Sequence, residues 1–183
     1  ASVTSSSHFG IGVNRGQPCP DGENRVFWTD GLVSPTGPVR DLHTSRLDGS
    51  DHIQLTTGEY YWDVCVSPSG DKLLVNDGSW DLRLLTLGLV NGQLAVTSNQ
   101  SLIVDDPNHP LNPWNNDWFF YTPWFEDVSA TNPNGTNVLF NASLTDMATG
   151  TTTQRLYRMD VTAPAVVTEL PLPAGRCTSP STT

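Results

Sequence analysis

Three carboxylates have the residue type and the setting for acid–base chemistry. Glu126 and Asp127 follow two aromatic residues, and Asp63 follows Trp62 in a similar context. Two carboxylates at a defined separation can cleave a glycosidic bond, one as the acid and the other as base or nucleophile. The similar settings of Asp63 and Asp127 equally indicate a structural feature that recurs along the chain. We therefore expect no catalytic residue, and Asp63, Glu126 and Asp127 are the candidates if that expectation fails.

A short acidic segment near the middle of the chain carries atoms that could bind a metal ion. Asp105, Asp106 and Asn108 offer the oxygen ligands that calcium prefers, and His109 adds a nitrogen. Their spacing matches no established calcium loop, and two neighbouring prolines favour a rigid turn in which Asx side chains cap the backbone. We therefore expect no cofactor, with Ca²⁺ at Asp105, Asp106 and His109 as the alternative.

An aromatic-rich stretch follows, and its rings are Trp114, Trp118, Tyr121, Trp124 and Phe125. Aromatic rings flanked by Asn and Asp can stack on sugars or form the anchor of a protein interface. The same rings can equally pack between sheets. The sequence contains no Gly-x-Ser-x-Gly nucleophile motif and no phosphate-binding glycine loop. Surface recognition by this stretch is therefore the function that the residue types favour.

Covalent modification is possible at two further sets of residues. Cys19 and Cys177 lie in turn-like contexts near the two ends and could form a disulfide, whereas Cys65 lies in an apolar run that predicts a buried thiol. The chain also contains three N-glycosylation sequons, which begin at Asn99, Asn134 and Asn141. These features matter if the protein passes through an oxidising, glycosylating compartment.

The composition excludes several classes of partner. The net charge is −10, which argues against nucleic acid because phosphate binding needs a basic face. No stretch approaches the roughly 20 apolar residues of a membrane-spanning helix. Only 15% of the residues are charged, and Thr, Ser, Asn, Gly and Pro are abundant, which is typical of an extracellular β protein with many turns. We expect a secreted or periplasmic protein without nucleic-acid binding or membrane insertion.

A Pro-x-Gly signature occurs three times and predicts the elements that position these residues. It lies at Cys19–Gly22, Ser67–Gly70 and Asn132–Gly135, and an apolar run follows each copy. The proline presets φ for a turn, and the glycine accepts the positive φ that ends it. Apolar residues nowhere recur at helical spacing over ten residues. The repeat therefore predicts an all-β chain of three four-stranded units, whose first strands include 9–13, 60–66 and 124–129.

The second unit and the segment before it resemble the repeat of TolB-like β-propellers of the six-bladed type. The resemblance covers residues 41–76 and rests on Leu47–Asp51, Gln54–Gly58 and Ser67–Gly70. It implies four-stranded blades that fan around an axis, with an Asp-Gly turn before the last strand of a blade. Such blades specify a fold and not a function, since they occur in binding proteins and in domains of enzymes alike.

The resemblance also implies an organisation of the chain and a partner. The expected parts are blade 1 (8–57), blade 2 (58–104), an insertion loop (105–120), blade 3 (121–172) and a tail (173–183). Propellers close with four to eight blades, so three blades require a protein partner or a second copy that completes the ring. Two copies would form a six-bladed ring.

These observations together favour a non-catalytic, extracytoplasmic β-propeller module. It would bind protein or glycan, and would assemble within a larger protein or complex. Two alternatives remain open at this stage. The chain could be the propeller domain of a hydrolase, either prolyl-oligopeptidase-like or acting on glycans. It could also be a structural subunit of an extracellular assembly.

Overall fold

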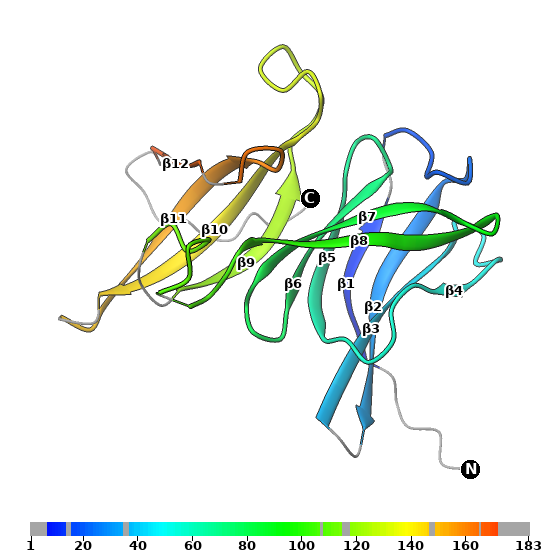
Figure 1. Cartoon of the computed structure of the whole chain (residues 1–183), viewed down its shortest axis with the longest axis horizontal. Coiled ribbons are helices and arrows are strands. Elements are labelled where there is room, and N and C mark those ends of the chain that lie inside the picture. The colour runs from blue at the N-terminus through cyan, green and yellow to red at the C-terminus, as the bar shows by residue number, and fades with distance from the viewer. Residues whose placement is uncertain are drawn as a thin grey trace.

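The computed structural model consists of three antiparallel sheets of four strands each (Figure 1). It describes residues 7–13, 16–34, 37–106, 108–114, 118–146, 149–164 and 166–171. The first sheet contains β1 (Ser7–Val13), β2 (Arg25–Ser34), β3 (Gly37–Arg46) and β4 (Ile53–Gln54). The second contains β5 (Tyr61–Val66), β6 (Lys72–Asp77), β7 (Leu82–Val90) and β8 (Gln93–Ile103). The third contains β9 (Trp118–Phe125), β10 (Asn137–Asp146), β11 (Thr151–Asp160) and β12 (Val167–Leu170).

In each sheet the strands pair in chain order, and the first strand of each sheet lies toward the other sheets. β5 packs against both β1 and β9, which makes these three the inner strands of consecutive blades (Figure 1). Each inner pair carries a register shift, at Phe9/Ile11, Tyr61/Asp63 and Leu139/Asn141. The arrangement confirms the predicted fold class, a partial β-propeller of three four-stranded blades. No described helix is long and apolar enough to cross a membrane.

The three Pro-x-Gly turns form as the sequence predicts. Gly22, Gly70 and Gly135 have φ values of 81°, 73° and 63°. Each glycine donates its N–H to the carbonyl oxygen three residues earlier, at 2.8, 3.0 and 3.2 Å respectively. Positive φ at these positions is accessible to glycine without a Cβ clash, so the signature ends the turn and starts the next strand in all three blades.

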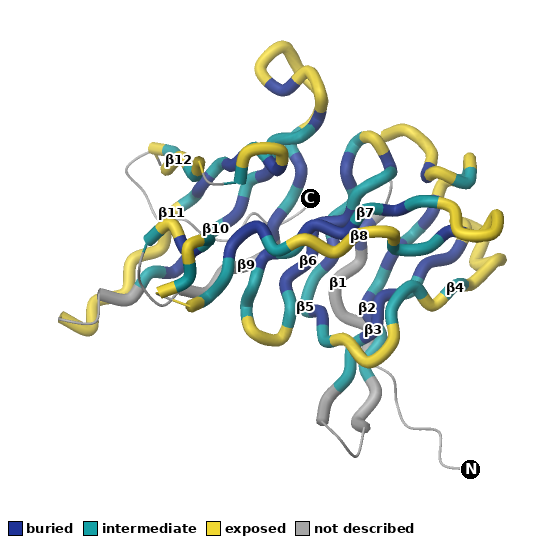
Figure 2. The backbone as a smooth tube through the Cα atoms, in the orientation of Figure 1, coloured by how far each residue is buried: buried dark blue, intermediate teal, exposed yellow. Residues whose placement is uncertain are grey.

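Two hydrophobic clusters fill the spaces between neighbouring blades. Figure 2 shows the buried residues concentrated where the blades face one another. β6 contributes to both: Leu73 and Val75 pack toward blade 1, whereas Leu74 packs toward blade 3. Side chains alternate between the faces of a strand, and a strand buried on both faces therefore reads as a continuous apolar run. Blade 1 buries Phe27 against blade 2, and blade 3 buries Phe140. The middle blade is thus sandwiched, and each outer blade buries one face against it.

The prediction for the first strand of blade 3 was wrong in its position. Residues 124–129 were expected, but β9 ends at Phe125 and begins at Trp118, inside the residues assigned to the insertion loop. The cause is Pro123, which lacks an N–H and normally interrupts a strand. Here Pro123 lies opposite the register shift between Leu139 and Asn141, where a missing donor is tolerated.

Tyr61 makes stability depend on pH in the alkaline range. Its side chain is fully buried at the start of β5, and burial raises its pKa to about 12. In the unfolded chain the pKa of Tyr61 returns to the ordinary value near 10. The neutral, buried side chain therefore contributes its full stability below about pH 10, and this contribution is lost as the pH rises toward about 12. We expect on the order of 2 kcal/mol of that stability to disappear between about pH 10 and 12. Urea denaturation across this range should show a smaller loss in Tyr61→Phe, and an equal loss in both proteins would contradict this assignment.

Candidate functional site

One end of the three sheets gathers the connections between blades. Neighbouring strands in these sheets run in opposite directions and pair in chain order. The start of the first strand therefore lies at the same end of the sheet as the loop that joins the second strand to the third. The start of β5, the β6–β7 loop and the chain leaving β8 therefore share one end, on the lower side of Figure 1. We call this end the entry face, and it comprises residues 55–60, 78–81, 104–106 and 108–114.

An aromatic cluster, defined as Arg40, Tyr60, Trp62 and Trp80, lies on the entry face where blade 1 meets blade 2. The rings of Trp62 and Trp80 stack with centroids 5.5 Å apart and planes 7° from parallel. Tyr60 meets Trp62 edge-on, at 5.2 Å and 88°. The Arg40 guanidinium carbon lies 4.3 Å from the centroid of the Trp62 ring and 5.1 Å from that of Tyr60. These contacts fix the planes of the rings.

Trp80 is held in a strained backbone conformation. Its φ is 67°, in the left-handed region that bulky side chains rarely adopt. The loop holds this geometry because Trp80 N–H donates to the Asp77 carbonyl, and Asp77 Oδ1 accepts from the N–H groups of Ser79 (2.9 Å) and Asp81 (3.1 Å). Arg83 Nε in turn donates to Asp77 Oδ2 at 2.6 Å. Strained residues of this kind cluster at active sites, ligand clamps and switch regions.

The chain that leads into the cluster is anchored by a buried carboxylate. Asp41 accepts hydrogen bonds from the backbone N–H groups of Gly58 (3.2 Å) and Glu59 (3.1 Å). It also accepts from Thr56 Oγ1 at 3.2 Å and Gln54 Nε2 at 3.3 Å. Four donors on one carboxylate leave the connection between the first two blades little freedom, so the cluster is built on a fixed support.

The arrangement offers a flat apolar platform beside acceptor groups. Indole rings stack on the C–H faces of sugars, and carboxylates such as Glu59 and Asp81 can accept bonds from hydroxyl groups. Within the described part of the chain, Trp62 Nε1 is buried and has no hydrogen-bond partner. Burial raises the pKa of Asp81, although the Asp105 N–H bonded to its Oδ1 opposes the rise.

Sequence reasoning did not single out these four residues. The signals were the run of rings that opens β5 and the tryptophan after the Asp-Gly-Ser loop. Arg40 comes from the preceding blade, and its place beside Trp62 follows only from the packing of the two blades.

The aromatic stretch that the sequence favoured is divided between different environments. Trp114 packs against Tyr157, with ring centroids 5.0 Å apart, and against Phe140 at 6.4 Å. Phe125 is 8% exposed and belongs to the core between blades 2 and 3, which corrects its assignment to a binding surface. Trp124 is half-buried in β9. Trp118 and Tyr121 also belong to β9, but the structure does not describe their side chains.

The three candidate catalytic carboxylates do not occupy equivalent positions. Asp63 lies within β5, whereas Glu126 and Asp127 follow the end of β9, so their expected equivalence was wrong. The physical reason is the longer connection of residues 126–136 in blade 3, against 67–71 in blade 2. Glu126 Oε2 accepts from Arg158 Nε at 3.0 Å and Nη2 at 2.7 Å, and Asp127 is exposed.

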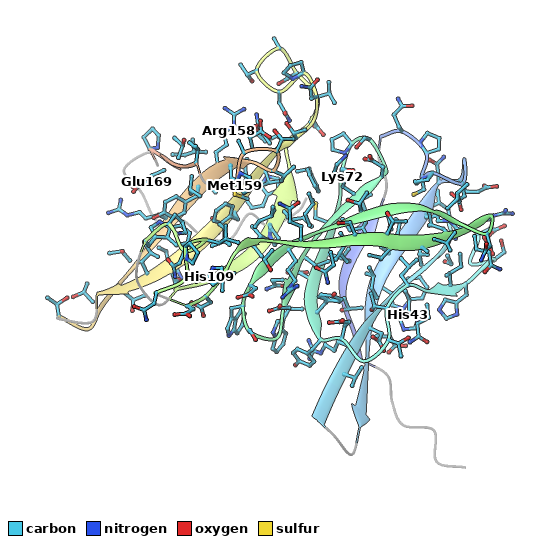
Figure 3. The ribbon with its side chains drawn as sticks, in the orientation of Figure 1. His43, Lys72, His109, Arg158, Met159 and Glu169 are labelled. Carbon is cyan, nitrogen blue, oxygen red and sulfur yellow. The ribbon has the colours of Figure 1, made fainter. Side chains whose placement is uncertain are left out.

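The candidate metal ligands cap turns of the backbone. Asp106 Oδ1 accepts from the Asn108 N–H at 2.9 Å, and His109 Nδ1 accepts from the Leu111 N–H at 3.1 Å. The backbone N–H of Asp105 donates to Asp81. His109 lies toward the entry face, whereas Lys72 and Arg158 lie toward the opposite end (Figure 3). Among the described residues, no three His, Cys, Asp or Glu side chains are grouped to hold a metal ion.

The residues proposed for covalent modification have mixed surroundings. Cys19 is buried in the core between blades 1 and 2, and Cys177 lies outside the described residues. Asn99 is exposed in β8, and its Oδ1 accepts a bond of 3.2 Å from Arg83 Nη1. Asn134 is exposed in the third Pro-x-Gly turn, and Asn141 is half-buried in β10.

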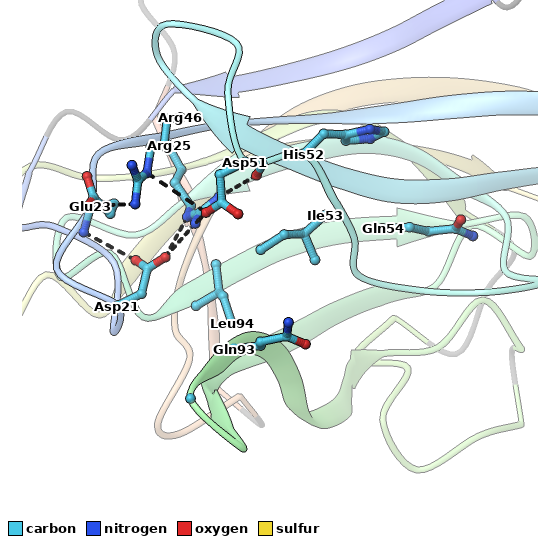
Figure 4. A pocket seen from close by; sticks show the side chains of 11 residues that line it. Asp21, Glu23, Arg25, Arg46, Asp51, His52, Ile53, Gln54, Gln93 and Leu94 are labelled. Atoms are coloured by element: carbon cyan, nitrogen blue, oxygen red, sulfur yellow. Dashed lines mark hydrogen bonds and ion pairs between the residues drawn. The ribbon is translucent and has the colours of Figure 1, made fainter.

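A cavity of about 520 Å³ opens at the outer rim of blades 1 and 2 (Figure 4). Arg25 is 1% exposed beside it and is bound by the carboxylates of Asp21 and Asp51. Arg46 bonds Glu23 at 3.0 Å. Three carboxylates thus share two arginines, and this ion-pair network lines the cavity and joins the turns of blade 1.

Comparison with known proteins defines a class. No family model and no curated protein matches the chain. Among solved structures, an oligogalacturonate lyase in complex with manganese is similar, with a TM-score of 0.52, 13% identity and coverage of 90% of this chain and 40% of that chain. An oligogalacturonate lyase from Vibrio parahaemolyticus is similar with a TM-score of 0.50, 14% identity and coverage of 90% and 46%.

These likenesses concern the fold. The chain spans less than half the length of both structures that it matches. TM-scores of 0.52 and 0.50 at 13% and 14% identity support a shared architecture alone, and the neighbours are propeller lyases. The chain is therefore a protein of the β-propeller type.

Proposed function

We propose that this chain is a non-catalytic, extracytoplasmic β-propeller module that binds carbohydrate through the aromatic cluster. The observation that carries the proposal is the stacked Trp62–Trp80 pair, in which Trp80 is held at a φ of 67°. A bulky residue keeps such a conformation only where the surrounding structure enforces it, and such sites cluster where ligands bind. Arg40 stacks on Trp62 and rigidifies the platform.

The charge of the protein favours an uncharged sugar over a polyanionic one. The net charge is −10, and Glu59, Asp77 and Asp81 flank the cluster. A surface potential of this sign repels acidic ligands at low ionic strength. Carboxylates beside aromatic rings instead suit the hydroxyl groups of a neutral sugar. Arg40 is engaged by the rings of Tyr60 and Trp62 and does not reverse this preference.

The structural likeness to oligogalacturonate lyases makes pectin fragments a reasonable first probe. Oligogalacturonate and its fully methyl-esterified form share one backbone and differ in charge. We expect both to change the tryptophan fluorescence saturably, with tighter binding of the ester and a difference that shrinks as salt is added. Absence of saturable binding to either form and to neutral β-linked oligosaccharides would overturn the proposal. Appearance of unsaturated or hydrolysed products would overturn its non-catalytic part.

The module also has two sheet faces turned away from the middle blade. Strand alternation places Val26 and Trp28 on the face of blade 1 opposite to Phe27, and Leu139 and Leu156 on the face of blade 3 opposite to blade 2. Within the arc, equivalent faces are covered by the next blade. We infer that a second copy covers them and completes a six-bladed, TolB-like ring.

Sedimentation tests this assembly. We expect a particle of twice the 19.9 kDa chain mass, and Leu156→Glu should dissociate it because the new carboxylate would be buried in the interface. Thr153→Glu is the matched control, since Thr153 is exposed in the same strand on its other face. A monomeric wild type, or equal behaviour of the two variants, would contradict ring completion.

A further inference from the structure

Two histidines meet on the face of blade 1 that is turned away from blade 2. His43 stands in β3 and His52 directly precedes β4, and His43 Nδ1 lies 3.0 Å from His52 Nε2. His52 is exposed and His43 is half-buried. The His52 ring extends away from the neighbouring Arg25–Asp51 ion pair (Figure 4). The pair is thus distinct from the aromatic cluster, and His52 also lines the cavity beside the ion-pair network.

A tryptophan holds both imidazole rings in place. Trp28 pairs with His43 across β2 and β3, and their rings stack with centroids 5.8 Å apart at 19°. Trp28 also stacks on His52, at 5.3 Å and 22°. The two imidazoles are 5.2 Å apart at 32°. The facing nitrogens therefore lie close together because the rings are packed against a common platform, which lowers the entropy lost on binding a ligand.

The separation of the nitrogens selects a metal geometry. With metal–nitrogen bonds of about 2.1 Å, two nitrogens 3.0 Å apart subtend an angle of about 90° at the metal. A tetrahedral ion needs about 109°, which would require the nitrogens to move apart to about 3.4 Å. Tetragonal coordination with angles near 90° is the preference of Cu²⁺ and Ni²⁺.

We propose that His43 and His52 form a two-histidine site for Cu²⁺, with water, or in the completed ring groups of the second copy, in the remaining positions. In the metal-free pair one facing nitrogen carries the shared proton and the other accepts it. Binding moves that proton to the other nitrogen of the same imidazole through solvent, so that both facing lone pairs bind the metal while both rings stay neutral. Ni²⁺ binds the same site more weakly, and Zn²⁺ is disfavoured by the angle and by the general order of affinities.

Titration of the whole chain with CuCl₂ and electron paramagnetic resonance tests the site. We expect one bound ion with two equatorial nitrogens, and at least tenfold weaker binding in His43→Gln and in His52→Gln. His109→Gln is the control. His109 lies on the entry face, and its replacement leaves both His43 and His52 in place. Equal Cu²⁺ affinity in wild type and both variants, or a spectrum with one histidine nitrogen, would overturn the proposal.

A second measurement does not depend on how the histidine variants fold. Bound Cu²⁺ quenches nearby indoles, and Trp28 stacks directly on both imidazoles. We expect Cu²⁺ to quench the wild-type tryptophan fluorescence in one saturable step. ZnCl₂ at the same concentration should not reverse this quenching. Competition by Zn²⁺ at equal concentration would contradict the geometric selection of a tetragonal ion.

Discussion

Replacing Trp80 by glycine should reduce carbohydrate affinity at least about 30-fold, as expected for an aromatic anchor worth about 2 kcal/mol. The same change should alter the free energy of unfolding by less than about 1 kcal/mol, because glycine at a φ of 67° relieves strain. That relief offsets the lost stacking on Trp62, which is worth about 1 kcal/mol. Fluorescence titration and urea denaturation of the same samples measure the two quantities.

Trp80→Ala is the matched control for this prediction. Alanine also removes the ring, but its Cβ meets the steric cost of the left-handed region, about 1 kcal/mol or more relative to glycine. The two variants should therefore lose binding equally and differ in stability. Unchanged affinity in Trp80→Gly would place the platform elsewhere. A fall in the free energy of unfolding well above about 1 kcal/mol in that variant would make Trp80 a structural residue.

Replacing Arg25 by alanine should cost about 3 kcal/mol of folding free energy, the lower part of the range for breaking a buried ion pair. Arg25 is 1% exposed, and its guanidinium is the shared partner of Asp21 and Asp51. Removal leaves Asp21, largely buried, without its cation, whereas Asp51 is 44% exposed and can regain water. The midpoint of urea denaturation should fall with an unchanged slope.

Arg46→Ala is the control from the same network. Arg46 bonds Glu23 at 3.0 Å, but both side chains are more than 40% exposed. Exposed pairs contribute between zero and about 1 kcal/mol, so this variant should remain close to wild type. Similar losses in the two arginine variants would show that burial is not what gives Arg25 its effect.

Local turn chemistry made most of the fold predictable. The Pro-x-Gly glycines adopt the positive φ that their positions require, and Asn91 and Gly92 form the expected hairpin turn with φ values of 53° and 80°. The apolar run Leu73–Val75 also indicated a strand, and the structure shows it buried on both faces of β6. These features follow from a few neighbouring residues, and the Pro-x-Gly turns were correct in all three blades.

The remainder depended on contacts between distant segments. Pro123 obscured the start of β9, because a proline inside a strand is tolerated only opposite a bulge that the sequence does not reveal. Arg40 and Trp62 meet only when two blades pack, and the φ of Trp80 is set by the hydrogen bonds of Asp77. The contacts within the aromatic cluster therefore could not be predicted from the sequence, although its aromatic residues are evident there.

Chemical-shift mapping of the indole N–H signals during titration with methyl-esterified oligogalacturonate tests the recognition proposal most directly. The indole signals of Trp62 and Trp80 should move saturably with the ligand, whereas that of Trp114, packed on Tyr157 in blade 3, should stay in place. Single replacements of each tryptophan assign the signals. Movement confined to Trp114, or no movement of Trp62 and Trp80 at saturating ligand, would contradict the proposed binding platform.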